Sequence, residues 1–170
     1  MEQRQREHAM VGQLTDWADA QRFMLAGDAY VTLRSKETGT RYTYRVSKAD
    51  CLKCGKGEPC TCGAKPRYFV SLLTGPDNEG DYTYLGMIFP GNGAPREFRA
   101  TKATGTQATG KPFLAFAYAW RALERDQSIP AKLEIWHEGR CGRCGRTLTV
   151  PESIARGIGP DCAGLMGVEL

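Results

Sequence analysis

The residues best suited to chemistry are three cysteines near the end of the chain. Cys141 and Cys144 are separated by two residues, each is followed by glycine, and Cys162 lies eighteen residues after Cys144. Two thiolates at this spacing can bind one metal ion, with zinc–sulfur distances of about 2.3 Å. The glycines let backbone N–H groups point at the sulfurs. The spacing therefore predicts a zinc site with Cys141, Cys144 and Cys162 as ligands.

The predicted fourth ligand of this site is a histidine. His137 lies four residues before Cys141, at the end of a strand expected over 131–136. Four protein ligands are typical of structural zinc, whereas catalytic zinc keeps one position for water. Two other sources of the fourth ligand remain open, Asp161 and a water molecule. In that case His137 is a packed, hydrogen-bonded residue beside Trp136.

A second group of cysteines lies earlier in the chain, in the pattern C-x2-C-x5-C-x-C. Its members are Cys51, Cys54, Cys60 and Cys62. A loop this short cannot bury enough apolar surface to become ordered, so a metal ion is the natural staple. The alternatives are a flexible thiol-rich loop and a metal site shared with another chain. Together the two groups predict two bound Zn²⁺ ions.

Composition indicates a folded protein that does not enter a membrane. The chain has 170 residues, of which 41% are hydrophobic and 25% charged. No apolar run approaches the roughly 18 residues that span a bilayer, and the N-terminus lacks the apolar core of a secretory signal. We therefore expect a cytoplasmic location. Reducing conditions there disfavour disulfides, which supports zinc as the role of the cysteines.

Hydrophobic periodicity predicts an α+β fold, with an antiparallel meander of four to five strands packed on one main helix. Residues 1–12 are expected to form a flexible tail and 13–136 the α+β core, including a zinc-stapled loop at 50–63. Residues 137–170 are expected to form a C-terminal zinc module similar in plan to a treble-clef finger. The expected strands of the meander are 29–34, 41–46, 67–73, 81–89 and 96–100. A short helix is expected over 15–26 and the main core helix over 112–125.

Positive charge is concentrated in residues 34–67, which hold nine basic and three acidic side chains. An electrostatic surface for nucleic acid is expected there. The basic residues are Arg34, Lys36, Arg41, Arg45, Lys48, Lys53, Lys56, Lys65 and Arg67. Strand alternation places Arg41 and Arg45 on one face, which is either solvated or contacts phosphates.

Residues 141–163 resemble a recurrent motif of small uncharacterised phage and bacterial proteins. The motif reads CGRCGRTLTVPESIARGIGPDCA, and the segments LTGPDN at 73–78 and DYTYLG at 81–86 resemble the upstream part of the same proteins. The resemblance implies Cys141, Cys144 and Cys162 as ligands and a phage or bacterial origin. It brings no established activity.

The residues present favour a binding protein over an enzyme. No pair of carboxylates and no nucleophile with a neighbouring base stands out. Residues 105–111 match the start of a phosphate-binding loop, but Pro112 occupies the position that requires Ser or Thr. The first expectation is nucleic-acid binding through residues 34–67. The alternative is a phage protein that binds and inhibits a host protein complex such as a defence system. A hydrolase would need an open zinc position.

Overall fold

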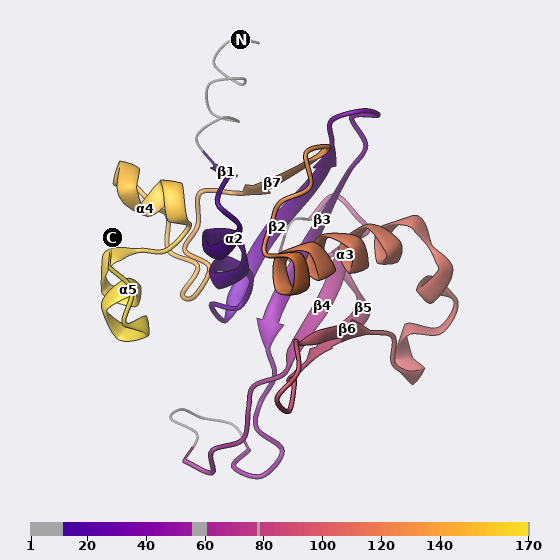
Figure 1. Ribbon diagram of the computed structural model, residues 1–170, viewed down its shortest axis with the longest axis horizontal. Coiled ribbons are helices and arrows are strands. Elements are labelled where there is room, and N and C mark those ends of the chain that lie inside the picture. The colour runs from indigo at the N-terminus through magenta and orange to yellow at the C-terminus, as the bar shows by residue number, and fades with distance from the viewer. Residues whose placement is uncertain (1–11, 56–60, 78, 170) are drawn as a thin grey trace.

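The computed structural model describes residues 12–55, 61–77 and 79–169. It confirms the α+β class and shows one antiparallel sheet of seven strands, where the sequence predicted four to five (Figure 1). The strand order is β1-β7-β2-β3-β4-β5-β6. The strands are β1 (Gln13–Leu14), β2 (Asp28–Ser35), β3 (Arg41–Lys48), β4 (Tyr68–Leu73), β5 (Tyr82–Phe89), β6 (Glu97–Arg99) and β7 (Leu133–His137).

The meander from β2 to β6 follows the chain, and the other two strands depart from it. β7 returns from the C-terminal part of the chain and pairs antiparallel with β2, so that Leu33 lies opposite Ile135. β1 then pairs with the outer edge of β7, with Leu14 opposite the same Ile135. The last strand is therefore an inner strand of the sheet. This placement brings the C-terminal cysteines close to the start of the described chain.

Two helices, rather than one main helix, cover the same face of the sheet (Figure 1). They are α2 (Trp17–Met24) and α3 (Lys111–Arg121), which continues into a π-helical turn, η2 (Ala122–Asp126). Asp16 caps α2 by accepting a hydrogen bond from the Asp19 backbone N–H at 3.0 Å. A 3₁₀ segment, η1 (Lys102–Thr109), precedes α3, and two short helices follow β7, α4 (Pro151–Arg156) and α5 (Pro160–Met166).

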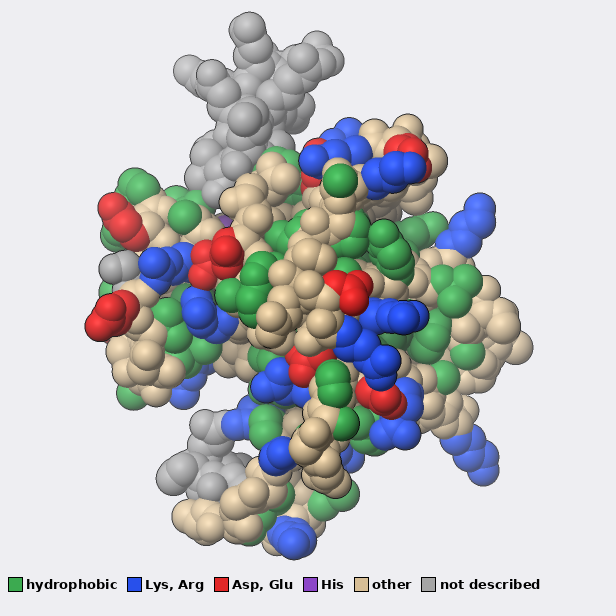
Figure 2. Space-filling model, viewed as in Figure 1, with side chains coloured by type: hydrophobic (Ala, Val, Ile, Leu, Met, Phe, Trp, Pro, Cys, Tyr) green, Lys and Arg blue, Asp and Glu red, His purple; other side chains and the backbone are tan. Residues whose placement is uncertain are grey.

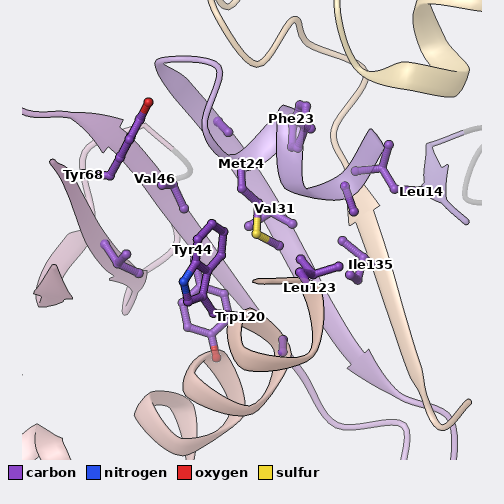
Figure 3. Close-up of a cluster of buried hydrophobic side chains, with 14 of the residues drawn as sticks. Leu14, Phe23, Met24, Val31, Tyr44, Val46, Tyr68, Trp120, Leu123 and Ile135 are labelled. Atoms are coloured by element: carbon purple, nitrogen blue, oxygen red, sulfur yellow. The ribbon is translucent and has the colours of Figure 1, made fainter. Parts of the chain in front are cut away.

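The core lies between this helical face and the sheet (Figure 3). Trp120 from α3 and Tyr44 from β3 are its largest fully buried side chains. The Tyr44 hydroxyl donates a hydrogen bond to the Pro112 carbonyl at 2.7 Å, and the Trp120 ring N–H donates one to the Arg96 carbonyl at 3.3 Å. Burial raises the pKa of Tyr44 strongly, so this phenol stays protonated and remains a donor.

Within the described part of the chain, no helix combines the length and the apolar character needed to cross a membrane.

Candidate metal centres

The structure brings Cys141, Cys144 and Cys162 together. Their sulfur atoms all lie within 4.8 Å of one another. Sulfurs bound to one tetrahedral ion at about 2.3 Å are separated by about 3.8 Å. Small movements of the three side chains would therefore allow all three sulfurs to bind a single metal ion. A [4Fe–4S] cluster fits less well, because each thiolate then binds a different iron and the sulfurs lie farther apart. This group could therefore hold one metal ion.

Backbone geometry explains why these three thiols converge. Cys141 and Cys144 lie in a tight turn closed by a hydrogen bond from the Gly145 N–H to the Cys141 carbonyl at 2.9 Å. Gly145 has a φ of 75°, which favours glycine. Cys162 lies in the first turn of α5. The Gly159 N–H points at the Cys141 sulfur at 3.4 Å, in the manner expected of a thiolate ligand.

The two buried thiols respond differently to this environment. Burial works to raise the pKa of Cys141, but hydrogen bonds from backbone N–H groups, foremost that of Gly159, lower it overall. Burial raises the pKa of Cys162 to about 11. A divalent cation reverses this effect, because a coordinating thiol is deprotonated. A metal ion bound at this group would therefore release protons, and its affinity would rise with pH.

The structure does not bring His137 to the three cysteines, contrary to the prediction that it is the fourth ligand. Its ring is buried, and burial lowers its pKa, so the imidazole is neutral at neutral pH. The Gly139 backbone N–H donates to His137 Nδ1 at 2.9 Å. Nε2 therefore carries the hydrogen and donates to the Ile154 carbonyl. Both nitrogens are thus engaged by backbone atoms, which gives His137 a structural role between β7 and α4.

His137→Asn distinguishes the two roles of this residue. The asparagine carbonyl can still accept from the Gly139 N–H, but the bond to Ile154 is lost. We expect unchanged metal content and a loss of about 1–2 kcal/mol in the free energy of unfolding. Metal analysis and urea denaturation measure these two quantities. In the matched variant Cys144→Ser, one metal ion should disappear. Loss of one metal ion from His137→Asn would restore the ligand assignment.

The C-terminal module packs into the main core. Phe23 of α2 lies against Gly142 and Gly157, where an added Cβ would come within 2.7 and 2.5 Å of its ring. The Asp28 N–H donates to the Gly142 carbonyl at 2.8 Å, which joins the cysteine turn to the start of β2. Cys141 and Cys162 belong to the same buried cluster as Phe23. The metal group thus lies at the junction of the module with α2.

The second cysteine group is also assembled, but on the surface. The sulfurs of Cys51, Cys54 and Cys62 lie within 4.8 Å of one another, and those of Cys51 and Cys62 are 3.4 Å apart. Cys54 and Cys62 are exposed. Cys60 and Lys56 lie outside the described residues. This group could hold a second metal ion, in a loop at the opposite end of the molecule from the β2–β3 turn (Figure 1).

The predicted basic residues do not form one surface. Lys36 belongs to the β2–β3 end, whereas Lys53 and Lys65 belong to the cysteine-loop end (Figure 1). Lys48 is the last residue of β3. Several of the others are engaged in contacts: Arg34 pairs with Glu134 at 3.0 Å, Arg45 pairs with Asp28 at 2.7 Å, Lys65 donates to the Gly91 carbonyl at 2.9 Å, and Arg67 donates to the Asp50 carbonyl at 3.5 Å. Arg41 is exposed and lies opposite Arg34 in the sheet register.

The structure reveals a surface that the charge count missed, on the sheet face opposite α2 and α3. Pairing places Ser47, Phe69, Met87 and Arg99 in one row across β3, β4, β5 and β6. Phe69 is 39% exposed. We call the following set the outer-face patch: Arg67, Phe69, Tyr84, Phe89 and Arg99, which surround the buried Met87. The alternation of side chains along β4 could have predicted this surface from the sequence. Tyr68 and Val70 point into the core, so Phe69 between them points to the opposite face.

Comparison with known proteins adds one finding. The sequence model of a family of unknown function (DUF6011) matches residues 132–167, from β7 through α5, and includes Cys141, Cys144 and Cys162. The match covers less than half of the chain, and the family's description supplies no activity. Neither the curated proteins nor the solved structures contain a significant match to this chain.

Proposed function

We propose that this is a non-enzymatic zinc protein that binds single-stranded nucleic acid on its outer-face patch. Each cysteine group would hold one Zn²⁺ ion. The C-terminal group would fix the module against α2, and the loop group would order the segment beside the patch. Of the residues that the structure describes, the single histidine is held by two backbone hydrogen bonds, which supports a binding role over acid–base chemistry.

The observation that carries this proposal is the exposure of Phe69 on the outer face of the sheet, in the same row across the strands as Arg99. Its ring lies 6.2 Å from that of Tyr84, edge to face. Bases stack on aromatic side chains of a sheet with little dependence on sequence, and each stack contributes about 1–3 kcal/mol. Because one sheet face packs against the helices and the other exposes Phe69, a flexible strand could lie along the outer face.

Arginines around the patch supply charge for phosphates. The Arg99 guanidinium lies 4.3 Å from the centre of the Phe89 ring. Its ion pair with Glu97 is long, at 3.8 Å, and both side chains are more than half exposed, so it contributes little. Arg67 reaches the Met87 sulfur at 3.8 Å, which places it at the border of the patch with the cysteine loop. Basic and acidic side chains are mixed on the helical face (Figure 2).

Phe69→Ala tests this surface directly. We expect its affinity for fluorescein-labelled single-stranded DNA or RNA, measured by anisotropy at low salt, to fall about 10- to 100-fold. The matched control is Tyr118→Ala, which removes an aromatic side chain that is 60% exposed on α3. This control should leave affinity within about twofold of the wild type. Affinity of the wild type should also fall steeply with added salt.

Two outcomes would count against the proposal. Equal losses in Phe69→Ala and Tyr118→Ala would mean that the patch is not the site. Absence of binding to every labelled single strand at low salt would remove nucleic acid as the ligand. The remaining candidate would then be a host protein complex, which also suits the phage origin that the sequence motif implies.

A further inference from the structure

The C-terminal cysteine group borders a cavity. All three sulfur-bearing residues line a cavity of about 460 Å³. Among the residues that the structure describes, no further Cys, His, Asp or Glu has a ligand atom within 4.8 Å of all three sulfurs. Zinc takes four ligands, and a set of three protein ligands leaves one position for a molecule from solution. The position of His137 away from the group makes this the expected arrangement.

We propose that this metal centre binds an exchangeable ligand, a small uncharged heterocycle that donates an aromatic nitrogen. The proposal rests on the metal-binding part of the proposed function and is independent of nucleic-acid binding. Aromatic nitrogen is a suitable donor for zinc and for cobalt, which can replace zinc in thiolate sites.

The charges around the group favour an uncharged donor. Three thiolates and one divalent ion carry a net charge of −1, and Asp161 adds a carboxylate on the cavity lining. The Arg143 guanidinium lies 4.0 Å from the Cys162 sulfur, and Arg146 also lines the cavity. These two cations balance the two negative charges. A neutral ligand preserves that balance, whereas an anion would add a negative charge beside the thiolates.

The cavity lining suits a flat ring. Leu148, Val150 and Leu165 provide apolar surface beside the cysteines, and Val150 and Leu165 are 45% and 73% exposed. Small-molecule sites have volumes of roughly 300–1,000 Å³, and this cavity falls in that range.

Cobalt spectroscopy with imidazole as the probe tests the proposal. The full-length variant Cys51→Ser/Cys54→Ser removes the loop site, so that Co²⁺ bound to the C-terminal group gives the visible bands. We expect imidazole to shift these bands saturably, with one imidazole per protein and with cobalt content unchanged. Adding Cys144→Ser should abolish the bands, which assigns them to this site. If the double variant does not fold, the wild-type chain with both sites loaded is compared with Cys144→Ser, and the bands that imidazole moves should be absent from that variant.

Unchanged bands at saturating imidazole, with cobalt bound, would overturn the proposal. So would a change of the bands before imidazole is added in Asp161→Asn, or in His8→Ala at the histidine that lies outside the described residues. In either case the chain itself would supply the fourth ligand. Failure to bind cobalt at all would contradict the metal centre itself. A cobalt ion that binds but does not respond to imidazole would contradict only the exchangeable ligand and not the metal centre.

Discussion

Cys141→Ser and Cys162→Ser are each expected to remove one zinc ion and to destabilise the whole protein. Both side chains belong to the main buried cluster, at 1% and 6% exposure. A ligand that binds only the folded state stabilises it by about 4 kcal/mol when its free concentration is about 1,000 times its Kd. The serine hydroxyl adds the cost of a buried polar group. Metal analysis and thermal unfolding should show both effects together.

Cys54→Ser is the matched control for these variants. It removes the same kind of ligand from a group whose members Cys54 and Cys62 are exposed. We expect loss of one zinc ion with a change of less than about 1 kcal/mol in the stability of the sheet, because an exposed loop can open locally. Equal destabilisation by Cys54→Ser and Cys141→Ser would contradict the different roles assigned to the two groups.

Phe23→Ala is expected to cost about 3–5 kcal/mol of stability and to weaken metal binding at the C-terminal group. Phe23 is 1% exposed, and its ring lies 5.4 Å from that of His137. It also packs against Gly142, which lies inside the cysteine turn, and against Gly157, whose carbonyl accepts a hydrogen bond from the Gly142 N–H. Removing the ring leaves a cavity under the turn, so that Cys141 and Cys144 lose their fixed position. Competition with a chromophoric chelator measures the metal affinity.

Phe116→Ala separates general destabilisation from this specific effect. Phe116 is fully buried on α3 and packs on Tyr44 and Phe98, in the part of the core under α3. Phe116→Ala removes the same side chain as Phe23→Ala, and we expect a similar loss in the free energy of unfolding. Metal affinity under native conditions should stay close to that of the wild type. If both variants weakened metal binding equally, the coupling through Phe23 would be wrong.

Local sequence patterns predicted most of the elements and both cysteine groupings. The C-x2-C spacing needs only a tight turn, and strand alternation needs only nearest neighbours, so both can be read without tertiary information. Pairing between distant segments could not be predicted in this way. β1 pairs with β7 through Gln13 and Trp136, which lie far apart in the sequence. The strand expected over 131–136 is present as β7, but its place inside the sheet was not predicted, and β1 was not predicted at all.

The site residues show the same limit. Distance along the chain suggested His137 as a ligand because Cys141 follows closely. In β7, His137 points to the core face of the sheet, toward Phe23 and the Ile154 carbonyl. The turn that follows places the thiols of Cys141 and Cys144 beside Cys162, away from the His137 ring. Phe69 was overlooked for a different reason. Charge counting weighs single residues, whereas the outer-face patch arises from the register of four neighbouring strands.

Each cysteine group is expected to hold one zinc ion, and native mass spectrometry of the purified chain measures this. The native mass should exceed the denatured mass by two zinc ions, and by one in Cys141→Ser and in Cys54→Ser. A native mass equal to that of the metal-free chain, with all thiols reactive, would contradict it.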